Sequence, residues 1–117
     1  MDSATKEKLA ASGIDYDGGI DRFGGNEAMF EKFIRRFSND SHLKSLHQAL
    51  SAKDAEKAYY HAHSLKGVVG NLSFKEYFNA ITPVADLLRE NKVDEAEKRM
   101  GQVEEAHSKV VQVLEDL

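Results

Sequence analysis

Apolar residues recur at spacings of three and four along almost all of the 117-residue chain, and no stretch alternates apolar with polar positions as a strand would. This pattern predicts helices and no sheet. Two short helices are expected first: one over residues 4–11, stopping at Gly13, and one over residues 17–23, ending at Gly24 and Gly25. Longer apolar stripes then follow one another to the end of the chain.

The first long stripe opens after Asn26, a residue type that caps helix N-termini, and continues to about residue 52. Ser38, Asn39 and Ser41 interrupt or re-cap it. Its apolar positions are Met29, Phe30, Phe33, Ile34, Phe37, Leu43, Leu46 and Leu50. We interpret the three phenylalanines as core residues and place Met29 on the shoulder of the stripe.

Three further helices show the same periodicity. Asp54 can cap the second long helix, whose buried seam is predicted to be Ala55, Ala58, Ala62, Leu65, Val69 and Leu72. The third follows Ser73 and Phe74, is closed by Asn91, and should be bent at Pro83 or lose one backbone hydrogen bond there. Its apolar positions are Tyr77, Ile81, Val84 and Leu88. The fourth is predicted as one helix with apolar positions Val93, Ala96, Met100, Val103, Ala106, Val110, Leu114 and Leu117.

Four long striped helices joined by short links predict an all-α fold, an up-down antiparallel four-helix bundle with short additional N-terminal helices. No linker, repeat or low-complexity segment divides the chain, so we expect residues 1–117 to form a single domain. The fraction of hydrophobic residues, 41%, and that of charged residues, 31%, are ordinary for a globular protein.

Charge and composition narrow the function classes. A net charge of −4 with scattered lysines and arginines argues against nucleic acid as a partner. The absence of cysteine excludes disulfides, thiolate chemistry and cysteine-ligated zinc. The polar N-terminus lacks the apolar core of a signal peptide, and no apolar run approaches the ~18 residues of a membrane helix. We therefore expect a cytoplasmic protein, and Met1 with the compact length favours a free-standing one.

The stretch HAHSLKGVVGNL, residues 61–72, places unusual residues on the outer face of the second long helix. At about 100° per residue, His63, Lys66, Gly67 and Gly70 share a narrow sector that points away from the apolar seam, and Tyr59 borders it. Each interior glycine costs a helix about 0.5–1 kcal/mol relative to alanine. Capping does not explain glycines far from helix ends, and packing explains them only in part. We interpret them as clearance that lets another protein approach the imidazole.

The chemistry of this face suits a phosphoryl acceptor. A neutral imidazole is a good nucleophile near pH 7, and a lysine one turn away can neutralise charge on a phosphoryl group. The residues AHSLKG, 62–67, followed by VVGNL, resemble the signature of histidine-containing phosphotransfer (HPt) domains of bacterial two-component phosphorelays. Residues 13–37 also resemble the N-terminal region of that family. At Ser73 and Phe74 many members have instead a glycine and a small or apolar residue.

The resemblance implies a phosphorelay intermediate without autonomous kinase activity. His63 would accept a phosphoryl group from a receiver-domain aspartate and pass it to another, Lys66 would stabilise the phosphoryl oxygens, and Gly67 would let the receiver close over the imidazole. The partners implied are response-regulator receiver domains and a hybrid sensor histidine kinase. The charge and the lack of a long apolar run lead us to expect no nucleic-acid and no membrane partner. No cofactor of its own and no metal site is expected, since Mg²⁺ would come with the receiver. We expect a monomer.

Two other interpretations remain open on the sequence alone. One is an adaptor that docks receivers or kinases through the same face without transfer, and the other is a helical enzyme or metal carrier that uses several histidines. His61 and His63 are two residues apart and do not face each other, which disfavours a shared metal. His42, His47 and His107 have no phosphate-like or metal-like context. Tyr59 and Met29 are candidates for an apolar docking patch, with a role in the core as the alternative.

Overall fold

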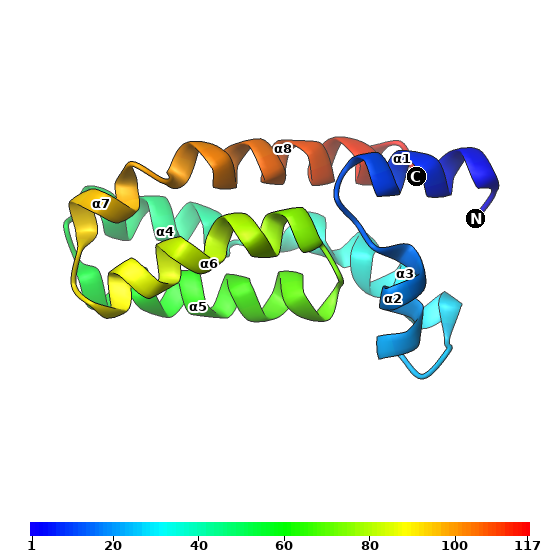
Figure 1. Cartoon of the computed structure of the whole chain (residues 1–117), viewed down its shortest axis with the longest axis horizontal. Helices are drawn as coiled ribbons and strands as arrows, with labels where there is room; N and C mark the ends of the chain where they lie inside the picture. Colours follow the sequence, from blue (N-terminus) through cyan, green and yellow to red (C-terminus); the bar gives the residue numbers. More distant parts are fainter.

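The computed structural model describes all 117 residues and contains eight α-helices and one 3₁₀ turn (Figure 1). The helices are α1 (Ser3–Ala11), α2 (Tyr16–Arg22), α3 (Glu27–Arg36), η1 (Phe37–Asn39), α4 (His42–Ser51), α5 (Ala55–Asn71), α6 (Lys75–Arg89), α7 (Val93–Glu97) and α8 (Met100–Glu115). The predicted all-α class is confirmed. None of these helices combines the length and the hydrophobicity needed to cross a membrane.

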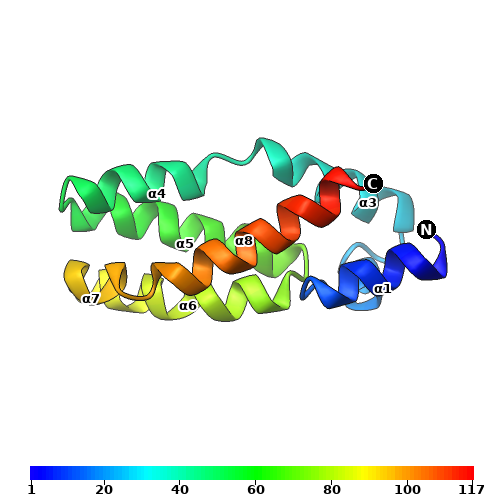
Figure 2. The same cartoon turned by 90° about the horizontal axis from the view of Figure 1, so that it is seen from above.

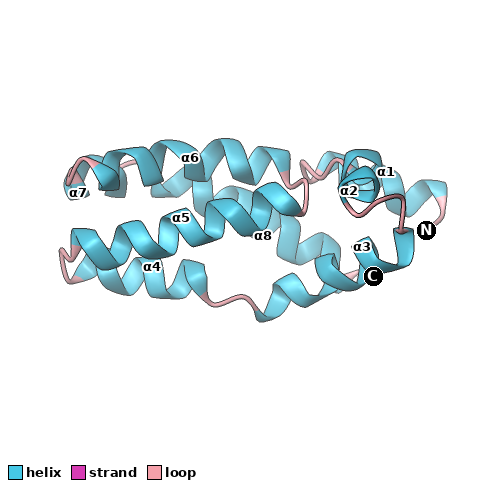
Figure 3. Ribbon diagram, turned by 90° about the horizontal axis from the view of Figure 1, so that it is seen from below, coloured by secondary structure: helices cyan, strands magenta, loops and turns pink.

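Four helices, α4, α5, α6 and α8, lie alongside one another and form the body of an elongated molecule of 44 × 24 × 20 Å (Figures 1 and 2). The chain reverses direction between α4 and α5 and again between α5 and α6, so α5 packs between its two neighbours. Helices α1, α2 and α3 gather at one end of this body, where both termini also lie. No helix covers the outer side of α5 (Figure 3).

Of the two interruptions in the long apolar stripes, the sequence predicted one. The break predicted around Ser38 and Asn39 exists: α3 passes into η1, and α4 begins after Ser41. The single last helix predicted from Val93 onwards is wrong, because a turn at Lys98 and Arg99 separates α7 from α8. Helices α7 and α8 both bury apolar residues against α6, so the apolar stripe continues across the turn. The spacing of apolar residues therefore did not reveal the break.

One connected core of 28 buried residues joins the helices of the body to the N-terminal helices. Its largest fully buried side chains include Tyr77, Phe30 and Phe74, and full burial of one such apolar side chain contributes about 1.5–3 kcal/mol. Leu9 and Ile14 bring α1 and the loop after it into the same core. The end of the bundle that carries α1–α3 thereby shares one core with the helices of the body.

The turn between α5 and α6 depends on a residue in the left-handed region. Ser73 has φ +58° and is buried, and its carbonyl accepts a hydrogen bond of 2.8 Å from the Asp15 amide. Ser73 thus adopts a conformation that favours glycine, the residue that many members of the resembled family carry here. Helix α6 then continues through Pro83 without interruption. The hydrogen bond between Asp15 and Ser73 ties the C-terminal end of α5 to the loop before α2.

Candidate functional site

Helix α5 is built so that one side is buried and the other is free. Asp54 caps it, its Oδ1 accepting a hydrogen bond of 3.1 Å from the Lys57 amide. The buried side of the helix consists of Ala58, Ala62, Leu65 and Val69. Because residues four apart lie on the same side of a helix, the positions between them point outwards, and His63 is exposed. We call Tyr59, His63, Lys66, Gly67 and Gly70 the His63 face.

The side chains flanking His63 come from both directions along the helix. The Tyr59 ring stacks on the imidazole, with the centroids 5.6 Å apart and the planes 24° from parallel. Lys66 lies on the α6 side, where its ammonium is 5.7 Å from the centre of the Phe78 ring. The lysines that form ion pairs are Lys53, Lys75, Lys92 and Lys109. The Lys66 ammonium has no carboxylate partner and is therefore available to an anion bound at His63.

The two glycines of the His63 face differ in their surroundings. A Cβ atom built on Gly67 would have no neighbouring atom within 4 Å, so the backbone there is open to solvent. A Cβ atom on Gly70 would lie 3.2 Å from two carbons of the Phe78 ring, tighter than ordinary packing allows. The expectation that both glycines lie far from helix ends is wrong for Gly70, because α5 ends at Asn71. Packing against Phe78 gives Gly70 a reason within the fold, whereas no contact in the chain explains Gly67.

Three large apolar side chains are exposed, and the sequence pattern predicted a position near the surface for only one of them. Met29 is 45% exposed, in keeping with its position on the shoulder of its stripe. Phe33, predicted to be core, is 38% exposed, because the α3 stripe is wider than the surface that the neighbouring helices cover. Tyr60, for which no role was predicted, is 61% exposed and packs its edge against His42 of α4. Tyr60 lies three residues before His63 and about 60° from it around the helix, and this spacing could have predicted that Tyr60 is exposed near the His63 face.

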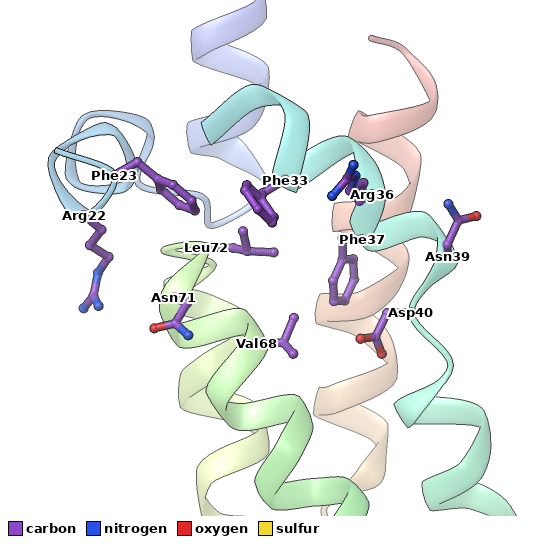
Figure 4. Close-up of a pocket in the computed structure, with 10 residues that line it drawn as sticks. All are labelled: Arg22, Phe23, Phe33, Arg36, Phe37, Asn39, Asp40, Val68, Asn71 and Leu72. Carbon is purple, nitrogen blue, oxygen red and sulfur yellow. The ribbon is translucent and has the colours of Figure 1, made fainter. Parts of the chain in front are cut away.

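A groove lies at the C-terminal end of α5, beside the His63 face (Figure 4). Its volume is about 670 Å³ and its apolar walls are Phe23, Phe33, Phe37, Val68 and Leu72. Phe33, Phe37 and Val68 belong to α3, η1 and α5, and Phe23 and Leu72 directly follow α2 and α5. Polar residues edge it: Arg22, Arg36, Asn39, Asp40 and Asn71. His63 is not among the lining residues, so the groove is a neighbouring surface and not a pocket around the imidazole. We call it the α3–α5 groove.

Contacts within the α3–α5 groove keep its aromatic walls in place. Phe23 stacks on Phe33, with ring centroids 5.3 Å apart, and the Arg36 guanidinium lies 5.5 Å from the centre of the Phe33 ring. Phe33 is thereby held at the surface between an aromatic ring and a cation. Met29, one helical turn before Phe33, continues the exposed apolar surface along α3.

The other histidines are engaged within the fold. The Nδ1 atoms of His42 and His61 are 3.1 Å apart, so one ring donates a hydrogen bond to the other. His47 lies 3.1 Å from a carboxylate oxygen of Glu104. His107 shares a hydrogen bond of 2.9 Å with the hydroxyl of buried Tyr77, and burial lowers the pKa of His107 from its ordinary value of 6.5.

Metal-ligating side chains do not gather anywhere on this chain. No group of three or more histidine or acidic side chains has the geometry to hold a metal ion. His61 turns towards His42 and not towards His63, as expected for residues two apart on a helix. The exposed imidazole of His63 therefore stands apart from the other histidines.

Comparison with protein-family models supplies the deciding observation. The model described as "Hpt domain" matches residues 29–113, most of the chain, and the His63 face lies inside that range. The chain belongs to the Hpt domain family. This Hpt domain has α1 and α2 in addition to the matched residues. Neither the curated proteins nor the solved structures compared with the chain match it.

Family membership establishes the general role of the chain. Hpt domains are phosphocarriers in the histidine phosphotransfer reactions of two-component phosphorelays, and they are not kinases. They work with receiver domains and histidine kinases. The resemblance carried by the residues around His63 is confirmed at this level.

Proposed function

We propose that His63 of this Hpt domain accepts a phosphoryl group from an aspartyl phosphate of one receiver domain and passes it to an aspartate of another. The observation that carries the proposal is the exposed imidazole on the uncovered side of α5, beside a backbone that Gly67 leaves bare. The partner's active site has to reach bonding distance of a ring nitrogen, and transfer depends steeply on such placement.

The step itself is a displacement at phosphorus. The lone pair of the unprotonated ring nitrogen of His63 attacks the phosphorus atom, the bond from phosphorus to the aspartyl oxygen breaks, and the carboxylate leaves with that electron pair. The second nitrogen of the ring retains its proton. Transfer to the next receiver reverses these events, with its carboxylate as the nucleophile. Tyr59, stacked on the imidazole, limits the ring orientations available to the attack.

Lys66 stabilises the phosphoryl group in this proposal. Its ammonium lies one turn from His63 and has no carboxylate partner of its own, so it can donate a charge-assisted hydrogen bond to a phosphoryl oxygen. Such a contact contributes about 1.5–3 kcal/mol. Mg²⁺ would be bound by the receiver, and the Hpt domain would supply the nucleophile and this one cation.

Docking of the receiver is proposed to use the apolar surface that continues from His63. Tyr59 stacks on the His63 imidazole, and exposed Tyr60, the next residue on α5, contacts the rings of His42 and His61. Met29 and Phe33 carry the exposed surface along α3 beside the α3–α5 groove. Exposed apolar surface of this kind marks protein–protein contacts. The arginines at the groove, Arg22 and Arg36, suit a partner whose phosphorylated site is anionic.

Transfer of radioactive phosphate from a phosphorylated receiver tests the assignment of His63. The wild-type chain and His61→Ala should become labelled, and the label should be acid-labile and base-stable, whereas His63→Gln should stay unlabelled. His61→Ala is the matched control because it removes a histidine from the same helix. Labelling of His63→Gln would refute the assignment. Binding of the receiver without labelling of any variant would instead indicate an adaptor.

A further inference from the structure

Phe78 of α6 lies against two residues of the His63 face at once. Its ring centre is 5.7 Å from the Lys66 ammonium, and two of its ring carbons lie 3.2 Å from the point where a Cβ atom on Gly70 would be. Lys66 and Gly70 are four residues apart and therefore neighbours on the same side of α5. The ring thus occupies the space that a side chain at position 70 would fill, and it extends from there towards Lys66.

The contact gives Lys66 its only defined partner. Lysine has a flexible stem with four carbons, and without a partner its ammonium samples many positions. The negative face of an aromatic ring attracts an ammonium ion without neutralising its charge, which a carboxylate would do. A cation held in this way keeps its full charge for a phosphoryl group.

We propose that Phe78 is a positioning residue for the phosphoryl-transfer site, and that Gly70 is glycine so that the Phe78 ring can lie against α5 and hold the Lys66 ammonium at the His63 face. The inference rests on the proposed roles of His63 and Lys66. It gives the two glycines separate tasks, because Gly67 leaves room for the partner and Gly70 leaves room for Phe78. It also makes α6 part of a site that the linear motif confines to α5.

The ring–ammonium contact can be tested without any transfer. The ring current of Phe78 should shift the Lys66 ε-CH₂ protons upfield in the NMR spectrum of the wild-type chain. Phe78→Tyr keeps a ring and should keep the shift, whereas Phe78→Leu should remove it. Gly70→Ala displaces the ring from α5 and should reduce the shift. Resonances of Lys66 that are the same in wild type and Phe78→Leu would overturn the proposal, whatever the role of His63 proves to be.

The consequence for transfer is tested by a double-mutant cycle with a phosphorylated receiver as donor. Phe78→Leu should slow labelling of His63 by about two- to fivefold, the factor that corresponds to an exposed cation–π contact. Gly70→Ala should slow it in the same direction, and Phe78→Tyr should transfer at the wild-type rate.

The Lys66→Met background separates positioning from a general effect on the fold. There, Phe78→Leu and Gly70→Ala should cause no further loss, because they act through the ammonium that has been removed. Equal losses in the two backgrounds would overturn the proposal. If Phe78→Leu lowers the melting temperature, the comparison rests on Gly70→Ala, which should slow transfer in the wild-type background and not in the Lys66→Met background, with Phe78→Tyr as the control. Labelling that persists in His63→Gln would refute the proposed function instead, and the NMR shifts distinguish that failure from this one.

Discussion

At the scale of single residues, the fold does not explain why position 67 is a glycine. Gly67 lies in the interior of α5, where glycine costs about 0.5–1 kcal/mol relative to alanine, and nothing in the chain would contact a Cβ atom there. Gly70 by contrast has Phe78 against it. Gly101 is the other helical glycine with no atom near an added Cβ, but it lies in the first turn of α8, outside a helix interior. For Gly67, which is interior and which no contact in the chain requires to be glycine, the approach of a receiver supplies a reason.

Gly67→Gln should separate stability from transfer. The new side chain extends into solvent and removes the helix penalty, so the free energy of unfolding should stay equal or rise by about 0.5–1 kcal/mol. Beside His63 the same side chain obstructs the partner, and the transfer rate should fall by roughly tenfold or more. Thermal melts and transfer from a phosphorylated receiver, measured on the same samples, provide both values.

Gly101→Gln is the matched control for this prediction. Gly101 is also an exposed glycine within a helix, α8, with no atom within 4 Å of an added Cβ, and it lies outside the His63 face. Because Gly101 is the second residue of α8 and not an interior one, the variant should gain the same stability or less, and it should transfer at the wild-type rate. If Gly67→Gln transfers like Gly101→Gln, the clearance argument for Gly67 is wrong.

At the scale of elements, the end of α5 is set by the turn at Ser73. The residue is held at φ +58° by a buried environment and by the hydrogen bond from Asp15 to its carbonyl. A left-handed conformation costs a residue with a Cβ atom about 1–2 kcal/mol. Ser73 therefore adopts a backbone conformation that serine disfavours, and the turn that it forms ends α5 beside the α3–α5 groove.

Ser73→Gly should stabilise the protein. Glycine adopts the left-handed region without the steric penalty, and after allowance for its greater freedom in the unfolded chain the gain should be about 0.5–1 kcal/mol. Urea denaturation gives the free energy of unfolding. Ser108→Gly makes the same chemical change at an exposed site inside α8, where it should lower stability by about 0.5 kcal/mol. A loss of stability in both variants would contradict the assigned strain.

At the scale of the whole molecule, a histidine couples the packing of α8 against α6 to pH. His107 of α8 shares its hydrogen bond with Tyr77 of α6, and its ring packs at 5.7 Å and 5.9 Å from the rings of Tyr77 and Phe37. Burial is the main cause that lowers the pKa of His107, and the charge of Asp40 opposes it to a smaller extent. The folded state therefore favours the neutral imidazole more than the unfolded chain does.

Stability should therefore fall as the pH drops from about 7 through the lowered pKa of His107, because the unfolded chain binds the proton first. The contribution is fully present above the ordinary histidine pKa of 6.5. Free energies of unfolding in urea, measured at about pH 7.5 and about pH 5, should differ more for the wild type than for His107→Gln, which does not titrate. The other histidines contribute equally to both proteins. An identical pH dependence in the two would show that His107 does not contribute.

The sequence by itself determined the features that lie within one helix. The spacing of apolar residues predicted the class of the fold, the interruption near Ser38, and the outward position of His63 with Tyr59 beside it. These follow from the geometry of the α-helix, in which local hydrogen bonds fix the angle between successive side chains at about 100°. The motif around His63 likewise lies within one continuous segment, and for that reason the linear sequence was enough to indicate the family.

Only the tertiary structure decided what meets across helices. The contact of Phe78 with Lys66 and Gly70, the pairing of His42 with His61, and the α3–α5 groove each join residues of different helices. The exposure of Phe33 and the turn between α7 and α8 likewise depend on how far neighbouring helices extend. The apolar period states which side of a helix is buried, but the rotation and offset of one helix against another come from the fit of whole side-chain surfaces, which a linear pattern does not contain.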